Sequence, residues 1–138
     1  MCHNRAVLRD AELALDGSLH ELARLAEELE RFCRERSLGS ELQFDLNLAL
    51  EELFTNAVQH GGCEGMERAV KIRLEAAGDG VEVEYCDRGI PFDPANAPAP
   101  DVSRVGGLGV HLVRNIMRDF KYQRAGEWNR ITMRRPYD

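Results

Sequence analysis

The chain has 138 residues and a mass of 15.6 kDa, so we expect residues 1–138 to form a single domain with its own hydrophobic core. Its 18 lysines and arginines are outnumbered by 24 aspartates and glutamates, which gives a formal charge of −6 and a pI of about 5.3. An acidic chain of this kind has no overall attraction for phosphate backbones or anionic lipid. Nucleic acid and membrane surfaces are therefore not expected as partners.

No apolar run reaches the roughly 18 residues that a membrane span requires, and the first ten residues lack the apolar stretch of a signal peptide. We therefore expect a cytoplasmic location. The four cysteines, at positions 2, 33, 63 and 86, have no Cys-x-x-Cys spacing, and no paired histidine motif accompanies them. This pattern favours reduced thiols over a zinc site or a disulfide framework.

The beginning of the chain predicts a strand followed by an amphipathic helix. The stretch AELAL, residues 11–15, alternates as a strand with one buried face does. Ser18 and Glu21 then have the spacing of a capping box, in which the two side chains satisfy the first N–H groups of a helix. Apolar residues at helical spacing predict that this helix continues to about Arg36.

A second helix is predicted to begin at Ser40, with Gln43 in the capping-box position, and to end at Gly61-Gly62. At about 100° per residue, one arc of this helix is apolar. That arc contains Leu42, Leu46, Leu50, Leu53, Phe54 and Ala57. Glu52 and Asn56 are four residues apart, so they share a strip beside the apolar arc, at the edge of the core.

Two alternating stretches, VKIRL from Val70 and VEVEY from Val81, predict an antiparallel hairpin with a turn at residues 76–80. The outer face is expected to pair opposite charges across the strands, Arg73 with Glu82 and Lys71 with Glu84. The inner face is expected to be apolar and to contain Val70, Ile72, Leu74, Val81, Val83 and Tyr85.

The last third of the chain contains an irregular segment, a helix and a second hairpin. Four of the five prolines fall between residues 91 and 100, so no regular structure is expected from about 92 to 105. The stretch GGLGVHLVRNIMRDF then becomes helical, and strands are expected at 120–124 and 130–134. This order predicts an α+β two-layer sandwich, with a mixed, mostly antiparallel sheet and its helices on one face.

The irregular segment has chemically informative flanks. Unstructured loops of this length in compact domains are usually functional lids or disorder, and we interpret residues 92–105 as a lid. Asp87 and Gly89 precede it at the end of a predicted strand. Gly107 and Gly109 follow it at a helix start, where free N–H groups and the helix dipole favour a phosphate. The common P-loop pattern and the complete dinucleotide fingerprint are both absent.

Three motifs in this order carry a resemblance to a known superfamily: Glu52-x-x-x-Asn56-Ala57 on a helix, Asp87-x-Gly89-x-Pro91-Phe92 after a strand, and Gly107-x-Gly109 opening a helix. Together they resemble the Bergerat-fold ATP-binding domain of gyrase-type ATPases, Hsp90-type chaperones and sensor histidine kinases. Within that superfamily, the small size and short lid are most similar to the anti-sigma factor serine/threonine kinases. The resemblance extends from about Ala11 to Arg134.

The resemblance implies ATP and Mg²⁺ as cofactors and a role for each motif residue. Asn56 would supply a side-chain oxygen to Mg²⁺, and Glu52 would orient or deprotonate the attacking hydroxyl. Asp87 would accept a hydrogen bond from the adenine amino group, and Gly89 would let the base approach the backbone closely. The residues implied to bind the phosphates are Gly107, Leu108 and Gly109.

Other residues near these motifs have competing interpretations. Arg104, at the end of the lid, would either reach the γ-phosphate or remain a solvated loop residue. His60 ends its helix, which favours a capping role over catalysis. Glu51, next to Glu52, is expected to be a solvated surface residue. Trp128 lies in a predicted hairpin turn, where an exposed aromatic would mark a partner contact.

The function implied by the resemblance is transfer of the ATP γ-phosphate to serine or threonine on a small anti-anti-sigma partner of the STAS type. The same domain would sequester an RNA polymerase sigma factor, and the family commonly acts as a homodimer. A non-catalytic ATP-binding module that switches partners is an alternative, as is the detached catalytic domain of a histidine kinase. The presence of both Glu52 and Asn56 favours the serine/threonine kinase.

Overall fold

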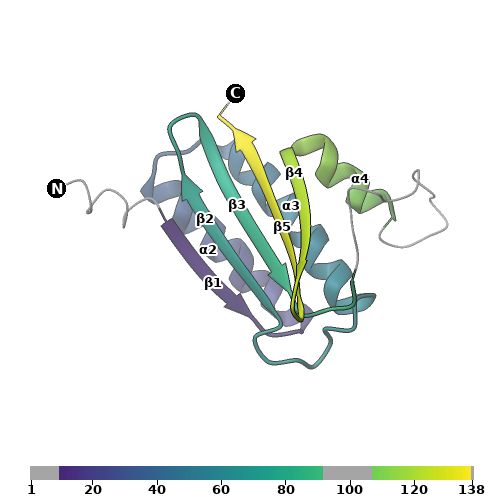
Figure 1. The fold of residues 1–138 in the computed structure, drawn as a ribbon. Helices are drawn as coiled ribbons and strands as arrows, with labels where there is room; N and C mark the ends of the chain where they lie inside the picture. Colours follow the sequence, from purple (N-terminus) through teal and green to yellow (C-terminus); the bar gives the residue numbers. More distant parts are fainter. Residues whose placement is uncertain (1–9, 92–106, 138) are drawn as a thin grey trace.

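The computed structural model describes residues 10–91 and 107–137 (Figure 1). The elements in chain order are β1 (Asp10–Leu15), the 3₁₀ turn η1 (Leu19–Glu21), α2 (Leu22–Glu35), α3 (Ser40–Gln59), β2 (Val70–Ala76), β3 (Gly80–Asp87), α4 (Gly107–Ile116), β4 (Arg118–Ala125) and β5 (Trp128–Pro136). This is the predicted order of strands and helices. The predicted lid, with Arg104, lies outside the described residues.

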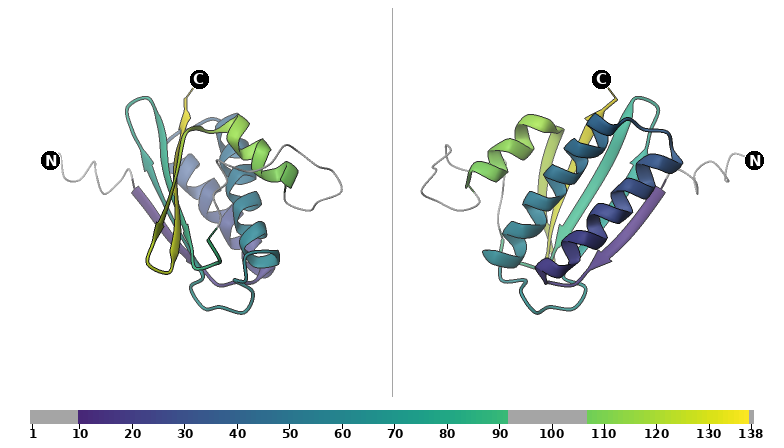
Figure 2. Two further views of the ribbon diagram at one scale, coloured as in Figure 1. Left: turned by 45° about the vertical axis from the view of Figure 1, so that its right-hand side comes forward. Right: turned by 180° about the vertical axis from the view of Figure 1, so that it is seen from behind.

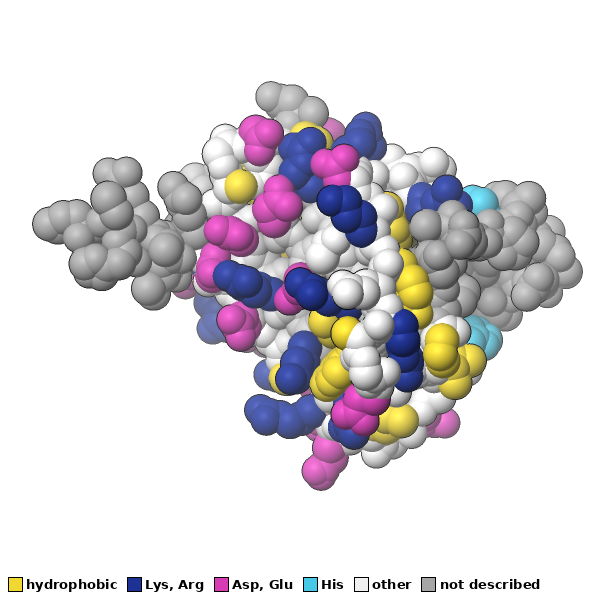
Figure 3. Space-filling model, in the orientation of Figure 1, with side chains coloured by type: hydrophobic (Ala, Val, Ile, Leu, Met, Phe, Trp, Pro, Cys, Tyr) yellow, Lys and Arg dark blue, Asp and Glu magenta, His cyan; other side chains and the backbone are white. Residues whose placement is uncertain are grey.

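The five described strands form one sheet in the order β1-β2-β3-β5-β4. Each neighbouring pair is antiparallel, so this sheet is antiparallel throughout and not mixed. Figure 2 shows the helices together on one side of the sheet, which confirms the α+β sandwich. The other face carries interspersed acidic and basic side chains (Figure 3), including the ion pair between Arg130 and Glu84.

The core lies between the helices α2 and α3 and the inner face of the sheet. All six residues of the predicted apolar arc of α3 are buried, as are all six predicted inward-facing residues of the β2–β3 hairpin. Burying one Leu, Val or Phe side chain contributes about 1.5–3 kcal/mol. This apolar interface therefore fixes α3 against the sheet, and with it the rotational position of Glu52 and Asn56.

The predicted cross-strand charge pairs of the β2–β3 hairpin are wrong by two residues. Arg73 lies opposite Glu84, and Lys71 lies opposite Cys86. The observed turn is shorter than predicted: β2 ends at Ala76, β3 begins at Gly80, and the Ala77 N–H donates to the Gly80 carbonyl at 2.8 Å. A two-residue shift leaves every side chain on its original face, which is why the core prediction holds while the pairing fails.

Neither predicted capping box forms in full. Ser18 Oγ does accept from the His20 N–H at 3.2 Å, but Glu21 reaches past Ser18 and accepts from the Asp16 N–H at 2.8 Å. Ser40 is the first residue of α3, and the N-cap is Gly39, which has no side chain to cap with. Local sequence spacing located both helix starts but misassigned their hydrogen bonds.

The last hairpin is longer than predicted and has a tighter turn. Its turn is Gly126-Glu127, and Gly126 has a φ of +62°, a conformation that favours glycine. Trp128 is therefore the first residue of β5 and not an exposed turn residue. Its partly buried ring has the Lys71 ammonium at 4.8 Å and the Arg88 guanidinium at 5.8 Å from its centroid.

Candidate active site

Glu52 and Asn56 lie one turn apart on α3, beside the residues that pack on the sheet. Both side chains are partly exposed. Within residues 10–91 and 107–137, neither side chain forms a hydrogen bond or an ion pair. Because no described residue binds either side chain, the carboxylate and the amide can bind a ligand without breaking a contact to this part of the chain.

The start of α4 packs against this strip of α3. A methyl group at Gly109 would lie 2.1 Å from Glu52 Oε2, so the carboxylate is directly against the α-carbon of Gly109. Gly107, Leu108 and Gly109 form the first turn of α4. The N–H groups of a first helical turn have no partner within the helix and carry the positive end of its dipole. The structure thus brings a carboxylate next to a potential anion-binding helix terminus.

Asp87 ends β3 and is 8% exposed. Its Oδ1 accepts two hydrogen bonds of 2.9 Å, one from the Gly89 N–H and one from Asn129 Nδ2. Two donors on one oxygen fix the plane of the carboxylate. The end of β3 therefore presents an oriented acceptor at the end of the molecule where the last turns of α3 and the β4–β5 turn also lie (Figure 1).

Gly89 is required by packing within the protein. A methyl group there would lie 2.6 Å from the Gly61 carbonyl oxygen and 3.0 Å from Asp87 Oδ1. The next residue, Ile90, donates its N–H to the same Gly61 carbonyl at 3.0 Å. The segment after β3 therefore packs closely on the segment after α3. This packing explains the glycine at position 89 without the close approach of a nucleotide base that the resemblance implied.

Two protonated groups lie near Asp87. Burial raises the pKa of the Tyr85 hydroxyl well above its usual value, and the charge of Asp87 raises it further. Burial also raises the pKa of the Cys63 thiol to about 11, again with a contribution from Asp87. The Tyr85 hydroxyl donates to the Leu53 carbonyl of α3 at 3.0 Å. Both groups therefore stay neutral at physiological pH and add no negative charge beside Asp87.

Asn129 is a site residue that the sequence analysis missed. It is 3% exposed and lies opposite Asp87 in the pairing of β3 with β5. Nothing in the local sequence AGEWN distinguishes it from a turn residue. Correct alignment of the last hairpin against β3 is the signal that would have identified it.

The remaining candidates do not join the site. His60 is the C-cap of α3. Its backbone N–H donates to the Asn56 and Ala57 carbonyls, and its side chain is exposed. Glu51 is partly exposed and accepts from Asn47 at 3.4 Å. Capping by His60 thus agrees with the prediction.

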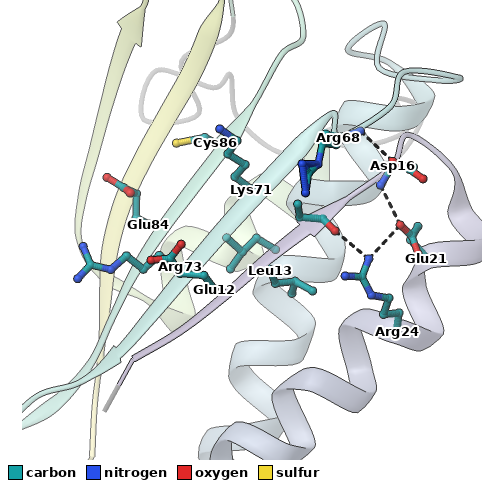
Figure 4. Close-up of a pocket in the computed structure, with 12 residues that line it drawn as sticks. Glu12, Leu13, Asp16, Glu21, Arg24, Arg68, Lys71, Arg73, Glu84 and Cys86 are labelled. Carbon is teal, nitrogen blue, oxygen red and sulfur yellow. Dashed lines mark hydrogen bonds and ion pairs between the residues drawn. The ribbon is translucent and has the colours of Figure 1, made fainter. Parts of the chain in front are cut away.

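A hollow of about 780 Å³ lies elsewhere, on the β1 side of the sheet (Figure 4). Two of its carboxylates have partners within the protein. Asp16 accepts from the backbone N–H of Arg68 at 2.8 Å, and Glu21 accepts from the Arg24 guanidinium at 3.3 Å. None of the motif residues lines it, so it is separate from the candidate site.

The α+β sandwich, with Glu52 of α3 against Gly109 in the first turn of α4 and Asn56 one turn further along α3, defines an ATPase-type nucleotide-binding domain. Residues 15–135 match the family described as histidine kinase-like ATPase domain, and the chain belongs to this family. The superfamily resemblance inferred from the three motifs is therefore confirmed. Among the described helices, none is long and apolar enough to cross a membrane.

The similar proteins reported next are named as protein kinases. The chain is 30% identical over 111 residues to the serine/threonine-protein kinase BtrW of Bordetella bronchiseptica, covering 76% of this chain and 78% of that protein. It is 34% identical over 89 residues to the serine-protein kinase RsbW of Bacillus subtilis, covering 57% of this chain and 56% of that one. These names agree with the kinase subgroup predicted from the sequence. The chain spans only about half the length of the Bacillus protein.

Solved structures support the same fold. The RsbU and RsbW domains of a Mycobacterium tuberculosis protein match with a TM-score of 0.70 at 16% identity, over 92% of this chain and 32% of that one. A blue-light activated histidine kinase domain from Erythrobacter litoralis matches with a TM-score of 0.51 at 21% identity, over 82% and 65%. At these identities the likeness concerns the fold alone.

Proposed function

We propose that this chain is an ATP-dependent serine/threonine protein kinase of the anti-sigma factor type. The observation that carries the proposal is the contact between the Glu52 carboxylate and Gly109 at the start of α4. A base candidate beside a phosphate-binding helix terminus is the arrangement that phosphoryl transfer requires. The kinase names of the relatives support the same activity.

The Glu52 and Asn56 side chains of α3 and the first turn of α4 fit Mg-ATP. The Asn56 side-chain oxygen would hold Mg²⁺, a hard cation that takes oxygen ligands and is bound by few protein groups. The N–H groups of Gly107, Leu108 and Gly109 would bind phosphate oxygens and balance their charge. The bound metal would neutralise charge that develops on the transferred phosphate.

Glu52 would act on the attacking hydroxyl. Its carboxylate accepts the proton of a serine or threonine hydroxyl as that oxygen bonds to the γ-phosphorus. The bond between the γ-phosphorus and the bridging oxygen breaks, and ADP leaves with the electron pair. General-base assistance of this kind is worth about 10²- to 10⁴-fold in rate.

Asp87 would recognise the base. Its carboxylate accepts a hydrogen bond from the adenine amino group, whereas guanine presents a carbonyl acceptor at the corresponding position. Two acceptors that face each other leave buried groups unpaired, at a cost of roughly 1–3 kcal/mol. A preference for ATP over GTP follows.

The partner is proposed from the family resemblance. A small STAS-type anti-anti-sigma protein would provide the serine or threonine, and an RNA polymerase sigma factor would compete for the same domain. Nucleotide state would then bias partner choice, because a ligand that binds the two complexes with different affinity shifts the equilibrium between them. We propose a cytoplasmic location and a possible homodimer on the same basis.

The test uses labelled ATP, Mg²⁺ and lysate from the source organism, with identification of the phosphorylated protein. Glu52→Gln is expected to bind ATP normally and to lose at least about 100-fold in transfer, while the neighbouring control Glu51→Gln keeps both activities. Normal transfer by Glu52→Gln would remove Glu52 as the base. Acid-labile phosphate would indicate a histidine kinase, and ATP binding without any transfer would indicate a non-catalytic module.

A further inference from the structure

The side-chain amide of Asn129 is buried and fully hydrogen-bonded. Its Nδ2 donates to Asp87 Oδ1 at 2.9 Å and to the Ile90 carbonyl at 2.7 Å. Its Oδ1 accepts from the Tyr122 hydroxyl at 2.6 Å and from the Arg124 guanidinium at 3.2 Å. An asparagine amide has two donor hydrogens and two acceptor lone pairs, and all four are used here.

These contacts allow only one orientation of the amide. A flip would place Oδ1 of Asn129 against two acceptors, Asp87 Oδ1 and the Ile90 carbonyl. The same flip would turn the NH₂ group toward the guanidinium of Arg124, which is itself only a donor. Arg124, which can only donate, therefore keeps Oδ1 of Asn129 on its own side and the NH₂ group toward Asp87, and the Tyr122 hydroxyl adds a second donor to Oδ1.

Arg124 also holds the backbone on which Asp87 depends. The same guanidinium nitrogen donates to the Gly89 carbonyl at 2.7 Å. The N–H of Gly89 is the second donor to Asp87 Oδ1. Asn129 of β5 therefore supplies one of the two hydrogen bonds that orient the carboxylate, and Arg124 of β4 holds Gly89, which supplies the other.

We propose that Asn129, oriented by Tyr122 and Arg124, is a positioning residue that fixes the Asp87 carboxylate for recognition of the nucleotide base. Because Oδ1 of Asp87 already accepts from two donors, Oδ2 of Asp87 is the oxygen that accepts from the amino group of the base. Asn129 has no donor left for the ligand, so it acts through Asp87. This inference rests on the proposed function, because it assigns a determinant of base preference at the same site.

The position of the network predicts which kinetic constant changes. None of the hydrogen bonds of Asn129, Arg124 and Asp87 given above involves Glu52, Asn56 or α4. A variant that loosens Asp87 should therefore raise KM for ATP and narrow the preference for ATP over GTP, while kcat at saturating ATP stays unchanged. A residue with a merely structural role would change stability without altering the base preference.

The experiment compares Asn129→Asp, Tyr122→Phe and Asp87→Ala, with binding of ATP and of GTP measured by titration calorimetry. Asn129→Asp keeps the shape of the side chain but replaces its donor with an acceptor, so ATP affinity is expected to fall at least about 10-fold. Tyr122→Phe removes one hydrogen bond and keeps the ring, so a fall in ATP affinity of about 2- to 5-fold is expected. Asn47→Ala, which removes an amide that donates to Glu51, is the matched control and should bind normally.

The outcomes separate the two proposals. Absence of ATP binding by the unmodified protein would overturn the proposed function itself. If Asp87→Ala weakens ATP binding but Asn129→Asp and Tyr122→Phe bind both nucleotides normally, the positioning role is wrong and the proposed function stands. If Asn129→Asp does not fold, as judged by thermal unfolding, an unchanged ATP-to-GTP preference in Tyr122→Phe refutes the role.

Discussion

Gly89→Ala tests the close packing between the end of β3 and the end of α3. The added methyl group would lie 2.6 Å from the Gly61 carbonyl oxygen and 3.0 Å from Asp87 Oδ1. The first of these atoms belongs to the backbone, so a side-chain rotation cannot relieve the clash. One of the two segments must move, and the hydrogen bond from Ile90 to Gly61 weakens with it.

The expected cost follows from this geometry. Overpacking of a buried site costs about 1–3 kcal/mol. A domain of this size loses about 4 °C in melting temperature per kcal/mol, so a decrease of roughly 4–12 °C is expected. ATP affinity should fall as well, because the Gly89 N–H is one of the two donors that orient Asp87.

Thermal unfolding can be followed with Trp128, the only tryptophan of the chain. The matched control is Gly78→Ala, since a methyl group at Gly78 meets nothing within 4 Å. This control experiences the same loss of unfolded-chain entropy without the clash, so it should be neutral or slightly stabilised. Equal melting temperatures for the two variants would refute the packing argument.

Two further predictions concern Glu52 and Cys63. Gly109→Ala places a methyl group 2.1 Å from Glu52 Oε2. Because the flexible carboxylate can rotate away from this methyl group, phosphoryl transfer should fall about 10-fold or more while the protein loses little stability. Normal transfer by this variant would contradict the placement of Glu52. The folded pKa of Cys63 is raised from 9.0 to about 11, so its stabilising contribution is complete below about pH 9 and is lost between pH 9 and 11. Urea unfolding across this window should show a smaller loss of stability for Cys63→Ala than for the unmodified protein, and parallel curves would exclude the effect.

Side-chain periodicity predicted the parts of the fold that depend on burial. The apolar arc of α3 and the inner face of the β2–β3 hairpin were both identified, because a residue faces the core according to its position in a 3.6- or two-residue period. The same periodicity placed Glu52 and Asn56 on one strip of α3. These are local properties, set by the spacing of side chains along one element.

Turn and cap geometry were predicted less well. The pairing of Arg73 with Glu84, the N-cap at Gly39 and the entry of Trp128 into β5 each differ from expectation. Each depends on one or two backbone hydrogen bonds at the end of an element. Residue spacing alone leaves neighbouring positions almost equivalent there, and a turn that shifts by one residue moves every cross-strand partner by two.

The sequence by itself determined the order and faces of the elements and, through its three motifs, the family of the chain. Only the tertiary structure decided which residues meet. Glu52 contacts Gly109 because α4 packs on α3. Asn129 reaches Asp87, 42 positions away, because β5 pairs with β3 in the sheet. Contacts between distant segments depend on strand order and helix packing, for which no single stretch of sequence carries a periodic signal.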